Sequence, residues 1–124
     1  MLKVKRVYEK KDGSDGRRIY VDRLWPRGLS KREAEIDEWM KDLSPSADLR
    51  KWFGHEPAKF EEFKRRYRKE LEAAESKARL RQIATMSERE DVTLLYSARD
   101  TEHNNAVVLA ELVGALMRNS TARG

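Results

Sequence analysis

Two apolar-rich segments near the start of the chain predict strands. LKVKRVYE (2–9) alternates apolar and basic side chains, the period-two pattern of a half-buried strand. RIYVDRLW (18–25) is rich in strand-forming residues. The connection over 10–16 contains two Asp-Gly pairs, which favour turns. We therefore expect an antiparallel N-terminal β-hairpin.

The next segments carry shorter signals. Ser30 and Glu33 have the spacing of a capping box, which predicts a short helical turn over 31–35. IDEWMKDL (36–43) places its apolar residues at helical spacing, but its shortness before Ser44-Pro45 also suits a strand, and we favour the strand.

Helix signals then dominate as far as residue 86. Ser46 is a natural N-cap for ADLRKWF (47–53), and Gly54 is suited to end that helix. Pro57 is suited to open a second, long helix with an apolar stripe from Phe60 onward. We predict this helix over 58–82, and a polar loop over 87–91.

The end of the chain predicts a central strand and a last helix. DVTLLYSA (91–98) is apolar without clear alternation, as in a strand that is covered on both faces. A loop over 99–105 leads to a helix over 106–117, and we expect a frayed tail over 119–124. Residues 1–124 thus predict a single α/β domain: a three-layer sandwich with a mixed, mostly parallel sheet flanked by helices.

Charge and composition limit the class of protein. The 124 residues carry 27 basic and 22 acidic side chains, so the net charge is +5, and 40% of the residues are charged. A basic balance favours anionic partners but also suits an ordinary soluble domain. The density of mixed charge resembles the ion-pair networks of heat-adapted proteins, which suggests thermostability.

The absence of certain sequence features also argues against several classes of protein. The chain has no cysteine, so it has neither disulfides nor thiolate metal ligands. It begins without the apolar segment of a secretory signal, and no apolar run approaches the length that spans a bilayer. We therefore expect a cytoplasmic protein that is not bound to a membrane.

Three segments combine strand or helix ends with cations. YSARDTEHNNA (96–106) leaves the central strand and enters the last helix, a place that suits an anion held by Arg99 and by the amides near Asn104. In RLWPRG (23–28), Arg23 and Arg27 flank a rigid turn at a strand end. In 43–55, Ser46 starts a helix that carries Arg50. Ordinary capping, packing of Trp25 and solvated arginines are the structural alternatives.

Other chemistry has weaker support. His103 with Asp100 is the best candidate pair for proton transfer, since imidazole titrates near neutral pH. The chain has no HExxH, GxSxG, GxGxxG or Walker A motif, so we predict no metal site and no cofactor. The basic run KRRYRK (64–69) permits a rival hypothesis, nucleic-acid binding through the helix 58–82, although nearby glutamates favour a solvated helix face.

Three blocks resemble the YeaO-like family, a branch of a larger family of small bacterial and archaeal proteins. They are VDRLWPRGLSK (21–31), DEWMKDLSPSADLRKWFGH (37–55) and VTLLYSARDTEHNNA (92–106). The resemblance implies a parallel strand within 37–46, and no reaction. Other branches of the larger family carry a Cys after the matching late strand, where this chain has SARDTEHNNA. The positions shared with the blocks are Arg23, Arg27, Ser46, Arg50, His55, Arg99, Asp100, His103 and Asn104.

Together these observations predict a pocket for a small anionic or phosphorylated ligand at the carboxyl edge of the sheet. Arg23, Arg27, Arg50 and Arg99 would supply charge, and Ser46 and Asn104 hydrogen bonds. A non-catalytic interaction protein is the third possibility.

Overall fold

A parallel β-sheet forms the centre of the molecule. The computed structural model describes residues 1–123, with side chains as far as residue 119. In this part of the chain, four strands pair in the order β1-β4-β2-β3, and every pair is parallel. They are β1 (Leu2–Arg6), β2 (Arg17–Tyr20), β3 (Glu38–Trp39) and β4 (Val92–Tyr96). The expected α/β fold is confirmed, as is the strand within 36–43.

The predicted β-hairpin is wrong, and so is the predicted mixed sheet. β1 and β2 do not pair with each other, because β4 lies between them and runs parallel to both, with Leu94 opposite Val4 on one side and Ile19 on the other. The Asp-Gly segment does turn the chain, but it forms a 3₁₀ turn, Gly13–Asp15, that Asp12 caps. The fully buried β4 displaces the local pairing, because its apolar side chains are covered on both faces.

The helices begin largely where their caps predict. They are α1 (Lys31–Ala34), α2 (Ala47–Phe53), α3 (Phe60–Glu70), α4 (Ala74–Arg89) and α5 (Asn105–Arg123). The Ser30–Glu33 capping box, the Ser46 cap and the left-handed Gly54 are confirmed.

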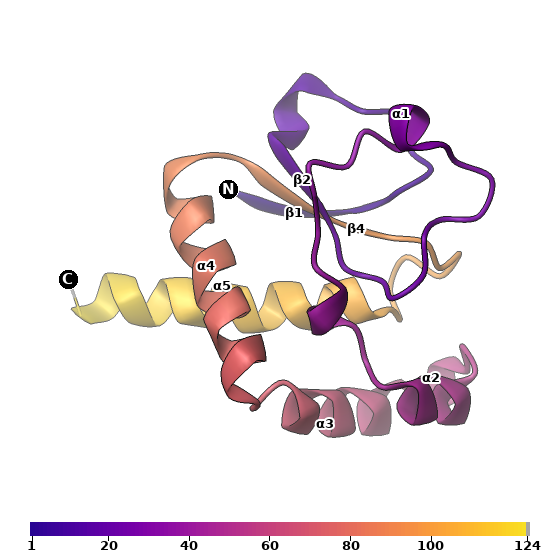
Figure 1. Cartoon of the computed structure of the whole chain (residues 1–124). Helices are drawn as coiled ribbons and strands as arrows, with labels where there is room; N and C mark the ends of the chain where they lie inside the picture. The colour runs from indigo at the N-terminus through magenta and orange to yellow at the C-terminus, as the bar shows by residue number, and fades with distance from the viewer. Residues whose placement is uncertain (124) are drawn as a thin grey trace.

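The single long helix predicted over 58–82 is wrong. A 3₁₀ turn (Pro57–Lys59) leads into α3. The helix is interrupted at 71–73, and α4 continues in a different direction (Figure 1). Leu71 is buried at the break, so tertiary packing overrides the helix propensity of this segment. α4 also extends to Arg89, through part of the predicted loop over 87–91, and the Ser87 hydroxyl donates to the carbonyl of Ile83.

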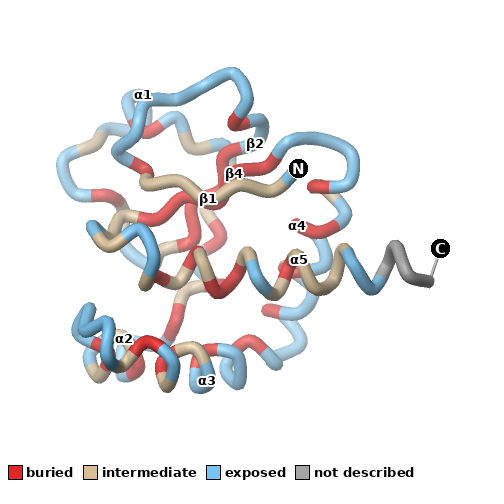
Figure 2. Tube along the Cα trace, turned by 180° about the vertical axis from the view of Figure 1, so that it is seen from behind, coloured by how far each residue is buried: buried red, intermediate tan, exposed pale blue. Residues whose placement is uncertain are grey.

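The two faces of the sheet are covered differently. Ile19, Leu94 and Tyr96 belong to the main core, which the helices α2 to α5 complete. Tyr20 and Leu95 lie on the other face and pack under residues of the connection from β2 to β3, which contains α1. In Figure 2 the buried positions concentrate along β2 and β4, inside a largely exposed outer layer.

The carboxyl ends of β1, β2 and β4 share one edge of the sheet, because the three strands are parallel. α5 begins at this edge, on the right in Figure 1, and α2 lies below it. The expected frayed tail stays a prediction: α5 is helical to Arg123, and Gly124 lies outside the described residues. Within the described chain, no helix has the length and apolar character needed to cross a membrane.

Candidate functional site

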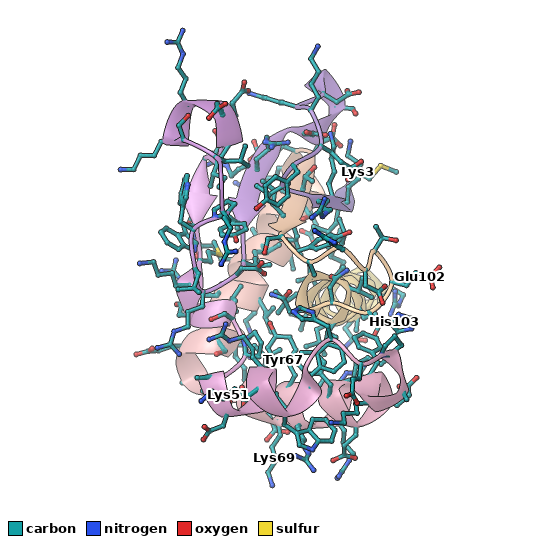
Figure 3. All side chains as sticks on the ribbon, turned by 90° about the vertical axis from the view of Figure 1, so that its right-hand side faces the viewer. Lys3, Lys51, Tyr67, Lys69, Glu102 and His103 are labelled. Atoms are coloured by element: carbon teal, nitrogen blue, oxygen red, sulfur yellow. The ribbon has the colours of Figure 1, made fainter. Side chains whose placement is uncertain are left out.

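A cavity of about 580 Å³ opens at the carboxyl edge of the sheet. It is lined by the loop after β2, by residues of α2 and its two ends, and by the connection from β4 to α5. Figure 3 views the molecule from this side, with α5 seen end on. In this view Lys51 of α2 lies on the left of the molecule and His103 on the right, with Tyr67 of α3 between them.

The loop after β2 is held rigidly, which positions Arg23 and Arg27. Trp25 packs against Tyr20 and Trp39, and its indole Nε1 donates to the carbonyl of Leu29 at 2.6 Å. The Tyr20 hydroxyl donates to the carbonyl of Leu24 at 2.7 Å. Trp25 is thus an anchor, as one interpretation of RLWPRG proposed, and both arginines line the cavity beside it.

Gly28 allows the loop to close. Its φ of +83° lies in the left-handed region that glycine adopts without strain. Directly before Gly28, the carbonyl of Arg27 accepts from the Tyr8 hydroxyl at 2.8 Å, which joins the segment after β1 to the loop.

Asp22 and Ser97 join the ends of the two central strands, and sequence reasoning missed both. One Asp22 carboxylate oxygen accepts from the Ser97 amide at 2.9 Å and from its hydroxyl at 2.7 Å. The Tyr20 hydroxyl lies 3.3 Å from the same oxygen, and burial, followed by the Asp22 charge, raises the pKa of Tyr20. Asp22 lies two residues after β2 and inside the strand predicted over 18–25, and its partner follows only from the pairing of β2 with β4.

Arg50 lies in the last turn of α2 and lines the cavity. The residue is half-buried, and its Nε atom is buried without a hydrogen-bond partner in the described part of the protein. A buried donor without an acceptor costs roughly 1–3 kcal/mol, and more when it is charged. Arg50 is therefore the group at this edge that most needs an acceptor.

The cavity is electropositive. Arg23, Arg27, Arg50 and Lys51 line it, and none of them forms an ion pair with a residue that the structure describes. Asp22 is the carboxylate in the lining, and one of its oxygens already accepts from Ser97. Four cations therefore line the cavity against one carboxylate charge.

His103 is oriented by Asp100. The His103 Nδ1 atom lies 2.9 Å from one carboxylate oxygen of Asp100, and the other oxygen accepts from the backbone amides of Glu102 and His103. These amide hydrogen bonds, with a smaller contribution from the His103 side chain, lower the pKa of Asp100. Because Nδ1 is engaged, Nε2 is the ring nitrogen that remains for another partner. His103 lines the cavity, whereas Asp100 lies behind it.

The remaining predicted site residues are placed less favourably. Asn104 lines the cavity, but its side chain caps α5 by accepting from the Val107 amide and donates to the carbonyl of Asp100. The Ser46 hydroxyl caps α2 and donates to Glu70, outside the lining. Arg99 is exposed and also lies outside the lining. His55 lines the cavity in a left-handed conformation, with φ of +59°.

Four of the five basic side chains in the run 64–69 form ion pairs. Arg65 and Arg66 pair with Glu62, and Lys64 and Arg68 pair with Glu111 of α5. Tyr67 is buried, and its hydroxyl donates to the carbonyl of Leu43. This run is a solvated, ion-paired face, and it gives little support to the nucleic-acid hypothesis. Among the side chains described, no group of three His, Asp or Glu has the arrangement of a metal site.

Comparison with known proteins places the chain in a family. A family profile described as "Inactive DUF488-N3 subclade" (DUF488-N3i) matches residues 1–123. The uncharacterized protein YeaO of Escherichia coli (strain K12) is 42% identical over 115 residues, which cover 93% of this chain and 98% of that protein. The uncharacterized protein Rv3073c of Mycobacterium tuberculosis (strain H37Rv) is 40% identical over 112 residues, 90% of this chain and 92% of that protein. No solved structure matches the chain significantly. The chain therefore belongs to the YeaO-like proteins of the DUF488-N3i family.

Proposed function

We propose that the protein binds a small anionic or phosphorylated ligand in the cavity at the carboxyl edge of its sheet. The buried Nε atom of Arg50 is the observation that carries this proposal, because it has no acceptor among the described residues. A guanidinium holds phosphate, sulfate or carboxylate through two parallel hydrogen bonds, which is the chemistry that Arg50 offers.

The surroundings of Arg50 support an anion rather than a neutral ligand. Arg23, Arg27 and Lys51 line the same cavity without ion pairs in the described chain. α5 begins at the cavity, and the partial positive charge of a helix N-terminus also favours an anion. His103 can add a hydrogen bond through Nε2.

Binding without catalysis agrees with the family and with the sequence. The family is described as inactive, and the chain has no cysteine that could act as a nucleophile. Ser97 follows β4, but its hydroxyl donates to the Asp22 carboxylate, in a bond that joins two strands. The proposed role is therefore that of a binding protein.

A thermal-shift screen of phosphates, sulfates and carboxylates tests the proposal. A ligand at about 100 times its Kd stabilises the folded state by about 2.7 kcal/mol, which raises Tm by about 10 °C for a domain of this size. Arg50→Gln is expected to abolish the shift, and Arg50→Lys to reduce it, because lysine keeps the charge without the planar pair of donors.

Arg32→Gln is the matched control. Arg32 is an exposed arginine on α1, away from the cavity, with no ion pair in the described chain. This variant is expected to respond to anions as the wild type does. If every stabilising anion raises the Tm of Arg50→Gln as much as that of the wild type, the proposal is wrong.

A further inference from the structure

Exposed apolar side chains gather at the same cavity. Across the side chains that the structure describes, three large apolar residues are exposed: Met1 (73%), Leu24 (67%) and Tyr8 (38%). Leu24 and Tyr8 both line the cavity. A single exposed leucine on a protein surface needs no explanation. Two of the three exposed large apolar side chains at one electropositive cavity do need one.

The backbone of Leu24 and the side chain of Tyr8 are held in place by their neighbours. The carbonyl of Leu24 accepts from the Tyr20 hydroxyl, so the loop presents the leucine side chain at a defined position. The Tyr8 ring lies under the Arg6 guanidinium, 4.7 Å from the ring centroid, and its hydroxyl donates to the carbonyl of Arg27. The cavity therefore has a preformed apolar wall beside its cations.

We propose that the ligand is an organic anion with an apolar body, rather than a free inorganic oxyanion. This inference rests on the proposed function: the charged group binds at Arg50, and the apolar body covers Leu24 and Tyr8. Binding sites of about 300–1,000 Å³ accept ligands of the size of common metabolites, and a cavity of about 580 Å³ lies in that range. Inorganic phosphate would leave most of this volume, and the apolar wall, in contact with water.

Matched probes separate the two parts of the site. Phenyl phosphate and methyl phosphate carry the same charged group, and they differ in the apolar body. We expect NMR titrations of the ¹⁵N-labelled full chain to give a Kd at least about tenfold lower for phenyl phosphate than for methyl phosphate. Benzyl alcohol, which has the ring without the charge, is expected to bind far more weakly than phenyl phosphate.

Two variants locate the preference. Leu24→Ser is expected to reduce the ratio of the two Kd values at least threefold and to leave the Kd of methyl phosphate within twofold of the wild type. Tyr8→Ser is also expected to reduce the ratio at least threefold, and it should weaken methyl phosphate as well, because it removes the hydroxyl that donates to the carbonyl of Arg27. Leu24 is largely exposed, so we expect Leu24→Ser to keep the fold, and a Tm equal to that of the wild type checks this. Arg50→Gln is expected to weaken both phosphates together.

The outcomes distinguish this inference from the proposed function. Equal Kd values for the two phosphates in the wild type, lost together in Arg50→Gln, would overturn the apolar body and leave the anion site. A ratio that persists in both Leu24→Ser and Tyr8→Ser would also overturn it. If neither phosphate binds up to millimolar concentrations, the anion site and its apolar wall both fail.

Discussion

At the scale of single residues, one buried carboxylate holds together the start of β2. Asp15 is almost fully buried; it lies 2.6 Å from the Arg18 guanidinium and 3.0 Å from the Lys5 ammonium. Burial alone would raise the pKa of Asp15, but hydrogen bonds from the Asp12 amide, Lys5 and Arg18 outweigh it and lower the pKa to about 2. Since Arg18 is equally buried, the pair is a structural element of the fold.

We predict that Asp15 makes the stability of the protein depend on pH. Because its pKa is lower in the folded state, Asp15 contributes about 2 kcal/mol above pH 5, and this contribution is lost as the pH falls from about 4 to about 2. Asp15→Asn should destabilise the protein by about 3–5 kcal/mol at pH 7, because it leaves Arg18 buried without its partner. Its stability should also change less between pH 5 and pH 2.5.

Urea unfolding at a series of pH values measures both effects. Glu88→Gln, at an exposed position with no ion pair in the described chain, should follow the wild-type profile. A profile for Asp15→Asn that is parallel to that of the wild type would show that Asp15 does not carry the pH dependence.

Gly16 offers a second test at this scale. Its φ is +62°, and a Cβ atom at this position would lie 2.0 Å from the backbone oxygen of Asp91, where β2 pairs with β4. We expect Gly16→Ala to destabilise the protein by about 3 kcal/mol or more, since strand pairing must shift. Gly13→Ala is the control, because a Cβ there would meet no atom within 4 Å. Equal thermal stability of the two variants would contradict this account.

At the scale of elements, the helix caps could be predicted from the sequence, whereas the pairing of the strands could not. Ser30, Ser46 and Gly54 act on backbone groups within a few residues, so their caps follow from the sequence alone. In contrast, β1 pairs with β4, which lies some 90 residues away along the chain, and no local signal indicates that pairing. The break between α3 and α4 is set by packing around Leu71, and no proline or glycine marks it.

The candidate site follows the same division. Arg23, Arg27 and His103 follow recognisable strand ends, Arg50 lies in a helix with a recognisable cap, and all four line the cavity. Arg99 also follows a strand end but lies outside the lining. It lies in an irregular segment, where the sequence has no periodic pattern that would tell which way a side chain points.

Ser46 is predicted to be a cap rather than a ligand-binding residue, contrary to our expectation from the sequence. Its hydroxyl accepts from the Leu49 amide at 3.1 Å and donates to Glu70 at 2.7 Å. Ser46→Ala should therefore cost about 1 kcal/mol of stability in urea and change anion affinity by less than about threefold. A tenfold loss of affinity at unchanged stability would instead assign Ser46 to the site.

At the scale of the whole molecule, paired charges separate the cavity from the rest of the surface. Four of the five basic side chains in the run 64–69 are ion-paired with Glu62 or Glu111, whereas the cations of the cavity have no such partners in the described chain. The net charge of +5 therefore does not indicate a nucleic-acid stripe. Thermostability stays a prediction from the charge content.

We predict no binding of duplex DNA or RNA at low salt in a gel-shift assay. A binder that neutralises several phosphates loses affinity steeply as salt increases, because counterions are released. A shift at 50 mM salt that disappears by 200 mM salt would support the rival hypothesis. Glu62→Gln, which frees Arg65 and Arg66, should be the variant that begins to bind.

The most direct test of the anion site is a crystal structure of the protein soaked in selenate, with selenium located by anomalous diffraction. The account predicts a peak in the cavity, with a selenate oxygen within hydrogen-bond distance of Arg50 Nε, and no peak there in Arg50→Gln. A cavity without selenium, with Arg50 Nε donating to an acceptor of the protein itself, would contradict it.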